Sequence, residues 1–344
     1  MAKAAEIVGL DCAASVRAGA ALILRTRLEE MCAWRTAALD ASDPKGVHDM
    51  RVASRRLRSA LRDFAPYLPK RLPRKRLRKL AAALGAVRNE DVAIAAFAEL
   101  TQEAAPEIAE GLRVLAAERA VRRAHAHAAL AVLLAESAFA SLREKFLHKL
   151  ERAGAFTAKS VAAKRDADAQ TLRHAGRVII ASRLAECRAK GPALFRPRAV
   201  RRQHRLRIAA KRLRYALDLF VPCWGRELHE LAHEVARLQT SLGALHDCDE
   251  WITDLRARLE QQYDETSTAA DTADASVETV RHAAYWLLSK LIAKRAHHLR
   301  DALERWESWE STDFFARIAA ALDSLPAPSE PMQTMPAPPD ADGS

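Results

Sequence analysis

The sequence VHDMRVASRRLRSALRDF, residues 47–64, carries two stripes at helical spacing. Apolar residues recur at steps of three and four, from Met50 through Leu57 to Phe64, and predict a buried helix face. Cations recur at the same steps on the opposite face and predict a continuous basic ribbon. This ribbon consists of His48, Arg51, Arg55, Arg58 and Arg62. Only Asp49 and Asp63 stand near its ends, so most of these cations lack local partners.

The same helix recurs 156 residues later as QHRLRIAAKRLRYALDLF, residues 203–220. Its ribbon repeats His48, Arg51, Arg55 and Arg58 as His204, Arg207, Lys211 and Arg214. Downstream, LGAVRNED at residues 84–91 aligns with LGALHDCD at residues 242–249, at an offset of 158. The chain therefore contains an internal tandem repeat of two helical units. We predict a first repeat at residues 10–152, a linker at 153–169 and a second repeat at 170–325.

Composition predicts an all-α protein. The 344-residue chain is rich in alanine and leucine, has only 11 glycines and contains no segment with the pattern of a strand. We expect long antiparallel helices in two pseudosymmetric bundles around a basic channel. Helices are predicted at residues 13–39, 74–87, 91–100, 106–151, 170–190, 277–306 and 314–322, and Asp43 should cap the first basic helix. The Pro-rich segment at residues 326–344 is predicted to be a disordered tail.

The charge balance points to a polyanionic partner. The formal net charge is +11, and it is +14 for residues 1–325 because the tail holds three acids and no Lys or Arg. Residues 51–79 contain 12 Lys or Arg and one acid, and residues 196–214 contain nine and none. Cations at this density repel one another unless a polyanion neutralises them, so both segments predict an anion-binding surface.

These motifs resemble those of one known family. HxxRVxxRRLRSALRxF followed by LGxxRNxD, and then HxxRIxxKRLRYALxLF followed by LGxLHDxD, are similar to the paired motifs of the CHAD domain, the conserved-histidine α-helical domain. The resemblance covers about residues 10–325. It implies an all-α fold of two pseudosymmetric bundles that binds inorganic polyphosphate in a basic channel. The second copy has Ala236 where the family often has Lys and the first copy has Arg78, so that contact is not expected there.

We therefore predict non-catalytic binding of inorganic polyphosphate in a central channel. Arginine suits this role because its planar fork grips two phosphate oxygens together, whereas lysine acts as a point charge. The expected contacts are His48, Arg51, Arg55, Arg56, Arg58, Arg78, His204, Arg207, Lys211, Arg212 and Arg214. Nucleic acid should bind only non-specifically, and no cofactor, metal or catalytic residue is expected.

A zinc-protease signature occurs in the second repeat. HELAH at residues 229–233 matches HExxH, in which two histidines one turn apart hold zinc and the glutamate activates water. The repeat argues against that function, because the equivalent residues of the first copy are RLPRK, residues 71–75. No third histidine follows at the metzincin spacing. His48 and His204 are not expected to hold a metal either, because their helix faces offer only further cations.

A metal-dependent phosphohydrolase is one alternative function. His246 and Asp247 form the HD pair of helical enzymes of that class, and Asp249 could add a ligand. The first copy has Arg88 and Asn89 instead, which cannot bind a metal. A simpler interpretation is that the Asp and Asn residues of both motifs cap helices or support basic residues. These residues are Asn89, Asp91, Asp247 and Asp249.

A helical nucleic-acid-binding protein is the other alternative, because nucleic acid is also a polyanion. Such a protein would interleave stacking aromatics with its cations. Tyr215 is the only aromatic within either ribbon, apart from the core-facing Phe64 and Phe220.

The cysteines and the apolar segments indicate the cellular compartment. Five cysteines, Cys12, Cys32, Cys187, Cys223 and Cys248, form no CxxC pair, and their odd number predicts reduced thiols. The longest apolar tract, around residues 128–134, is too short to span a bilayer, and the N-terminus does not resemble a signal peptide. We therefore expect a cytoplasmic protein without membrane contact, with polyphosphate granules as a candidate location.

Overall fold

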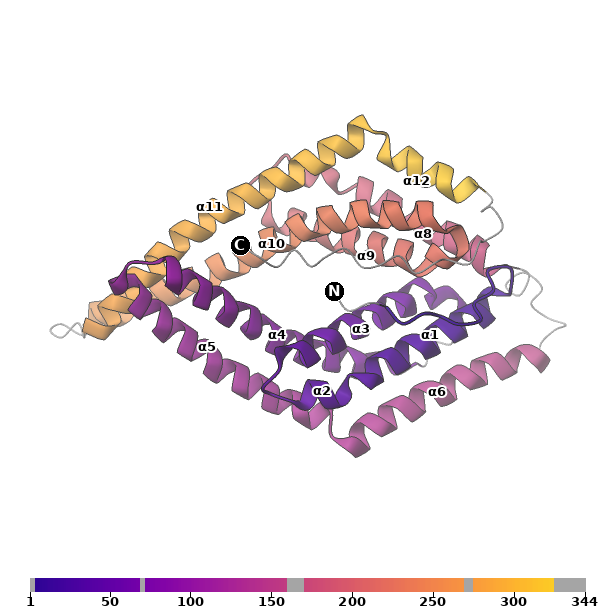
Figure 1. The fold of residues 1–344 in the computed structure, drawn as a ribbon, viewed down its shortest axis with the longest axis horizontal. Helices are drawn as coiled ribbons and strands as arrows, with labels where there is room; N and C mark the ends of the chain where they lie inside the picture. The colour runs from indigo at the N-terminus through magenta and orange to yellow at the C-terminus, as the bar shows by residue number, and fades with distance from the viewer. Residues whose placement is uncertain (1–3, 69–71, 160–169, 269–274, 325–344) are drawn as a thin grey trace.

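The computed structural model describes residues 4–68, 72–159, 170–268 and 275–324, and these are all-helical, as predicted. The long helices are α1 (Val16–Ala33), α3 (Pro44–Asp63), α4 (Arg74–Glu103), α5 (Pro106–Leu133), α6 (Glu136–Lys159), α8 (Leu172–Arg188), α9 (Val200–Trp224), α10 (Arg226–Thr268) and α11 (Ala275–Ser311). The short ones are α2 (Arg35–Leu39), η1 (Ala65–Tyr67), η2 (Gly191–Ala193) and α12 (Phe314–Asp323). Figure 1 shows α3 and α9 near the middle, while the α4–α5 and α10–α11 hairpins extend to one side and meet at their far ends.

Local sequence fixes where the helices begin. Asp43 caps α3, because its carboxylate accepts a hydrogen bond from the Lys45 amide at 2.8 Å and Pro44 takes the first helical position. This confirms the predicted cap. Ser15 and Thr171, which are equivalent in the sequence repeats, cap α1 and α8 through their side-chain oxygens.

Equivalent segments of the two sequence repeats also pair with each other. The Val16 amide donates to the carbonyl of Gln170 at 3.0 Å, and the Leu172 amide donates to the carbonyl of Ala14 at 2.9 Å. These four positions form a reciprocal set at an offset of 156. A twofold relation between two similar units produces reciprocal contacts of this kind.

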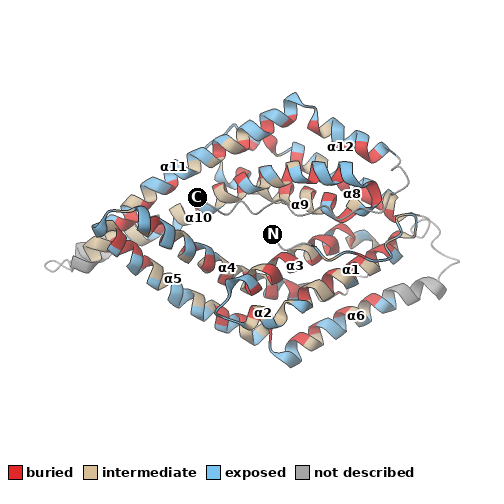
Figure 2. Ribbon diagram, viewed as in Figure 1, coloured by how far each residue is buried: buried red, intermediate tan, exposed pale blue. Residues whose placement is uncertain are grey.

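Both halves of the chain contribute to one large apolar core. Its buried side chains come from α1, α3 and α4 in the first half and from α8, α9 and α10 in the second. Phe64 and Phe220, again equivalent in the repeats, pack edge to face with ring centroids 5.9 Å apart. A smaller cluster around Phe97, Leu112 and Leu287 joins the far ends of the two long hairpins. Figure 2 shows the buried residues on the helix faces that point toward neighbouring helices. Each half therefore relies on the other to cover its apolar surface.

Several helix boundaries differ from the prediction. Residues 13–39 form α1 and α2 with a break at Trp34, and residues 106–151 divide into α5 and α6. Conversely, the segments predicted at 74–87 and 91–100 are one helix, α4, because no Gly or Pro in RNED ends it. Helix α6 extends to Lys159, into the predicted linker. The remainder of that linker, residues 160–169, and the predicted tail at 326–344 lie outside the described residues.

The prediction of five reduced cysteines is wrong for one pair. Cys12 and Cys223, 211 residues apart in sequence, form a disulfide with Cα atoms 5.6 Å apart, because the fold brings the segment before α1 against the end of α9. Cys32, Cys187 and Cys248 are free. The cysteines therefore do not support the expected cytoplasmic location.

The helices of the described residues are too short or too polar to span a membrane singly. Residues 106–133 and 136–152 meet the criteria of length and composition only as a pair bent by 56°.

Gly46 provides a test of the packing between α2 and α3. A Cβ atom at Gly46 would overlap the carbonyl oxygen of Ala37, so Gly46→Ala should lower the free energy of unfolding by about 1–3 kcal/mol, as overpacking does. Gly243→Ala in α10 is the control, because nothing lies within 4 Å of its Cβ position. That change should stabilise the protein by about 0.5–1 kcal/mol through helix propensity. Urea denaturation measures both, and equal stability of the two variants would contradict this packing.

Candidate anion-binding site

Cations from both halves converge where α3 packs against α4 and α9. We call this group the basic cluster. It consists of His48, Arg51, Arg55, Arg58 and Arg62 of α3, Arg78 and Arg88 of α4, His204, Arg207 and Lys211 of α9, and His246 of α10. Most of these side chains are half-buried, whereas Arg62 and Arg78 are exposed. The predicted ribbons of the two repeats therefore meet in one place.

Burial and mutual repulsion lower the pKa values of the cluster. The pKa of Arg51 falls to about 10, first through burial and then through the charges of Arg55, Arg88 and Arg207. The pKa of Lys211 falls to about 7, again first through burial and then through Arg207 and Arg55. Since Arg207 and Lys211 belong to the second repeat and Arg51 and Arg55 to the first, the two ribbons lie within Coulomb range of each other.

The histidines of the cluster have lowered pKa values. Burial and then neighbouring arginines lower the pKa values of His48 and His204. The Nδ1 atom of His48 is buried and has no hydrogen-bond partner among the described residues. His204 Nδ1 lies 3.3 Å from Nδ1 of His246. A neutral histidine donates through one ring nitrogen, so His48 has a donor or acceptor left for a ligand.

Two predicted contacts are instead ion-paired within the fold. Arg56 Nη1 bonds Glu30 of α1, and Arg212 Nη1 bonds Glu186 of α8 at 2.7 Å. The pairs occupy equivalent positions of the repeats, and Glu30 is only 6% exposed. Arg56 and Arg212 therefore hold each basic helix to its neighbour, and the charge of Arg212 also acts on Arg62 of the cluster. Their helix position explains this, since residues adjacent in sequence point about 100° apart.

Arg214 also has an acidic neighbour within its own helix. Its Nε atom lies 3.3 Å from a carboxylate oxygen of Asp218, one turn later in α9, and its guanidinium lies 5.8 Å from the ring centroid of Tyr215. The predicted contacts that do come together are His48, Arg51, Arg55, Arg58, Arg78, His204, Arg207 and Lys211.

The aspartates that end the repeated LG motifs support arginines. Asp91 pairs with Arg123 of α5, and the equivalent Asp249 pairs with Arg295 of α11, each through the arginine Nε at 2.5 Å. Both aspartates lie inside long helices, so the alternative that they cap a following helix is wrong. A buried or half-buried ion pair thus joins the two helices of each hairpin.

Arg88 and His246 belong to the cluster although they were not among the predicted contacts. They are equivalent in the two LG motifs, and each faces the leading part of the ribbon in its own repeat. Alignment of the two LG motifs could have identified both residues from the sequence. Asp247, beside His246, favours the charged forms of Arg51 and Arg207 and so counteracts burial. A metal ion at this HD pair would be repelled by the same arginines.

The histidines of the HELAH segment lie apart on an exposed turn of α10. Their Nε2 atoms, on His229 and His233, are 3.3 Å apart. Within the described residues, the group of three side chains that could hold a metal is elsewhere, at His297, His298 and Asp301 on α11, with ligand atoms within 4.8 Å of one another. The HHxxD spacing is visible in the sequence, but the prediction that no metal binds did not take it into account.

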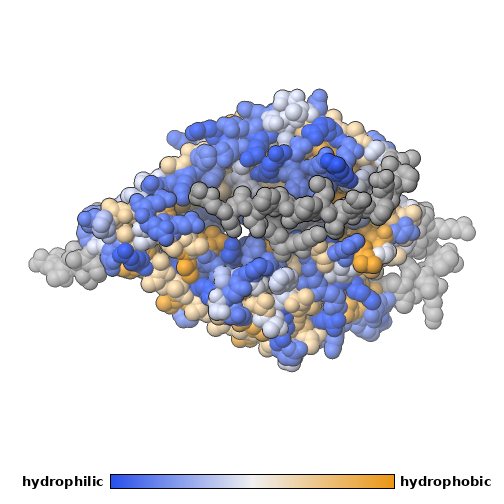
Figure 3. All heavy atoms as spheres, viewed as in Figure 1, coloured by the Kyte–Doolittle hydropathy of each residue, from blue (hydrophilic) through white to orange (hydrophobic). Residues whose placement is uncertain are grey.

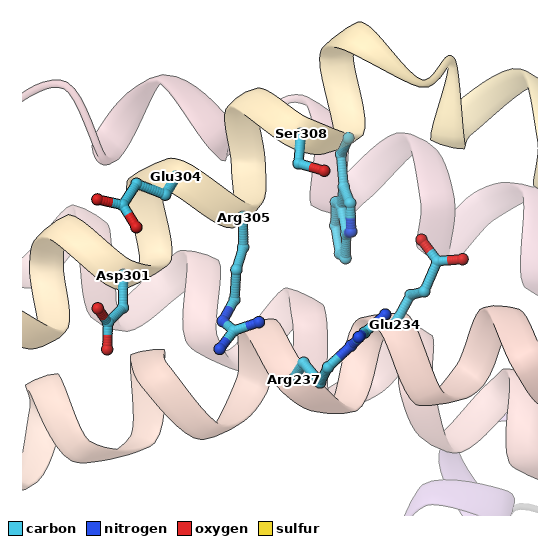
Figure 4. A pocket seen from close by; sticks show the side chains of 7 residues that line it. Glu234, Arg237, Asp301, Glu304, Arg305 and Ser308 are labelled. Atoms are coloured by element: carbon cyan, nitrogen blue, oxygen red, sulfur yellow. The ribbon is translucent and has the colours of Figure 1, made fainter.

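A pocket of about 310 Å³ between α10 and α11 lies outside the basic cluster (Figure 4). It is lined by Glu234, Arg237, Asp301, Glu304, Arg305, Ser308 and Trp309. Its two arginines are outnumbered by three carboxylates, so it offers no net positive charge to a polyanion. In Figure 3, hydrophilic residues dominate the described face over α11 and α12, and apolar residues form small separate patches.

Comparison with known proteins identifies the family. The CHAD domain model matches residues 22–256, more than half of the chain. The crystal structure of the CHAD domain from the plant Ricinus communis is similar over 94% of this chain and 97% of that chain, with 25% identity and a TM-score of 0.63. A comparison with curated proteins finds no match. The described residues form an all-helical fold with a cluster of cations between α3, α4 and α9. The chain belongs to the CHAD-domain family.

Arg56→Met and Arg51→Met should change the stability of the ligand-free protein in opposite directions. Arg56→Met removes a partner from the buried Glu30 and should destabilise by about 1.5–3 kcal/mol, the range for a hydrogen bond to a charged group. Arg51→Met removes a half-buried cation that its neighbours repel, so it should stabilise the protein at low salt. Urea denaturation in low-salt buffer measures both. Similar destabilisation by the two changes would contradict the division into paired and clustered arginines.

Proposed function

We propose that the protein binds inorganic polyphosphate without catalysis, in a channel lined by the basic cluster. The observation that carries this proposal is the apposition of two cationic ribbons at half-buried positions, where burial and then their mutual charges lower the pKa values of Arg51 and Lys211. A linear polyanion would replace this repulsion with charge-assisted hydrogen bonds. Membership of the CHAD family supports the same ligand, because the motifs that carry the resemblance supply most of the cluster.

We further propose that the two halves are pseudosymmetric bundles and that the channel follows their twofold axis. The reciprocal hydrogen bonds before α1 and α8, the Phe64–Phe220 contact and the matched ion pairs of Arg56 and Arg212 support this relation. A twofold arrangement presents similar cations twice along the ligand. That suits a chain of identical phosphates, which carries no sequence to be read.

The alternatives fit the cluster less well. A nucleic-acid site would need aromatic platforms, but Tyr215 lies beside the Arg214 guanidinium and no other aromatic interrupts the ribbons. A metal-dependent phosphohydrolase would need a cation at Asp247, where Arg51 and Arg207 lie within Coulomb range. We therefore propose binding as the function and assign no catalytic residue.

Arg51→Ala and Arg207→Ala should each weaken the binding of long-chain polyphosphate by about 10- to 100-fold, since each removes a charge-assisted contact. Binding should also weaken steeply with salt, because phosphate contacts release counterions. Competition at fixed salt among long-chain polyphosphate, single-stranded DNA and duplex DNA measures both affinity and preference.

Arg152→Ala is the control, because Arg152 is an exposed cation on α6, away from the cluster. Unchanged affinity in both cluster variants, with helicity retained, would rule out this site. DNA that competes as well as polyphosphate would favour the nucleic-acid alternative.

Polyphosphate affinity should fall as the pH rises from 7 to 9. The ligand-free protein holds the pKa of Lys211 at about 7, so Lys211 is mostly neutral at pH 8. Polyphosphate favours the charged form, so binding takes up a proton in this range and weakens as protons become scarce. Lys211→Arg stays charged and should flatten the profile. Calorimetry in buffers of different ionisation enthalpy measures the uptake, and equal uptake by both proteins would refute the role of Lys211.

A further inference from the structure

The two repeats differ most in charge in the segment that leads into each basic helix. Residues 39–49 of the first repeat read LDASDPKGVHD, and the equivalent residues 195–205 of the second read FRPRAVRRQHR. The first segment contains three aspartates and one lysine, whereas the second contains five arginines and no acid. We call the second segment the arginine loop. Its arginines are Arg196, Arg198, Arg201, Arg202 and Arg205, and all five are exposed.

Both segments are nevertheless anchored in the same way. Arg123 Nη1 donates to the carbonyl of Ala41 at 2.9 Å, and Arg295 Nη2 donates to the carbonyl of the equivalent Pro197 at 3.0 Å. In the arginine loop, Gln203 is 2% exposed and donates to two loop carbonyls at 3.0 and 3.4 Å. The backbone anchors are therefore shared, and the difference between the segments lies in the charges that they display.

An ion pair of the first repeat is replaced by two cations in the second. Lys45 is neutralised by Asp49 one turn later in α3, at 2.6 Å. The equivalent residues of α9 are Arg201 and Arg205. Both are exposed, and no described carboxylate forms a salt bridge with either. Solvated arginines of one sign at this density leave a positive field that a polyanion can use.

The arginine loop continues the basic cluster outward. Arg201 precedes His204 by three residues, so it extends the ribbon of α9 by one turn on the same face. From Lys211 to Arg201 the helix rises about 15 Å. Beyond that turn, a shallow depression of about 580 Å³ is lined by Arg196, Pro197, Arg198, Ala199 and Arg202. The positive surface therefore runs from the half-buried cluster to the exterior at the start of α9.

We propose that the arginine loop is an outer binding surface for the part of a long polyphosphate chain that projects from the channel. This inference rests on the proposed function. It adds that the preferred ligand is a polyphosphate chain longer than the channel, and it names the end of the channel at which that chain emerges. The chain leaves past residues 195–205 and is repelled at the equivalent loop of the first repeat, where Asp40 and Asp43 stand. Each exposed arginine contributes modestly, and their sum makes long chains bind more tightly than short ones.

The test is a loop variant with Arg198→Gln, Arg201→Gln and Arg202→Gln, measured against long-chain polyphosphate and tripolyphosphate. Because all three side chains are exposed, the fold should be retained. Affinity for long-chain polyphosphate should fall about tenfold or more through the loss of counterion release, whereas tripolyphosphate affinity should stay within about twofold. The matched control carries Arg152→Gln, Arg256→Gln and Arg300→Gln, which remove the same charge at exposed positions of α6, α10 and α11. It should leave both affinities nearly unchanged.

Arg51→Ala, measured in parallel, separates this inference from the proposed function. If Arg51→Ala weakens both ligands but the loop variant weakens neither, the arginine loop is no binding surface and the channel proposal stands. If the loop variant loses tripolyphosphate and long-chain polyphosphate equally, its arginines act within the channel and the inference is overturned. A larger loss for duplex DNA than for long-chain polyphosphate would also overturn it, in favour of a nucleic-acid surface. If Arg51→Ala changes neither affinity, the proposed function itself fails.

Discussion

Like-charge repulsion between the ribbons of α3 and α9 is the constraint on which the rest of the structure depends. The apolar faces of the same helices are buried in one shared core, where Phe64 meets Phe220, and this packing brings the cations together. Hydrophobic burial is non-directional and grows with area, so it can hold an unfavourable electrostatic arrangement in place. Burial, and then the charges of Arg207 and Arg55, lower the pKa of Lys211 to about 7. Placing like-charged cations together in this way lowers the stability of the ligand-free protein.

The fold divides its arginines between two tasks. Arg55 and Arg56 are neighbours in sequence, yet Arg55 lies among the cations of the cluster while Arg56 bonds the buried Glu30. Arg212 and Glu186 repeat that bond in the second half. These pairs fix the basic helices against α1 and α8. The helices that carry the cluster are therefore held in place by ion-paired arginines.

Equivalent segments of the two halves share backbone anchors but differ in side-chain charge. Arg123 and Arg295 hold equivalent loops through matching bonds to a carbonyl and to the aspartate of the LG motif. With the backbone fixed in this way, side-chain charge can change without altering the helix that follows. The loops at residues 39–49 and 195–205 differ in just this respect, which makes the two ends of an otherwise similar arrangement electrostatically distinct.

The sequence by itself determined the helical class, the repeat, the two ribbons and the cap at Asp43, because periodicity and capping depend on residues within a few turns of one another. Tertiary structure alone decided which cations are paired and which are not, as with Arg56 and Arg212. It also decided that Cys12 meets Cys223. These outcomes depend on contacts between residues far apart in the chain. Packing of whole helix faces sets such contacts, and no local pattern encodes them.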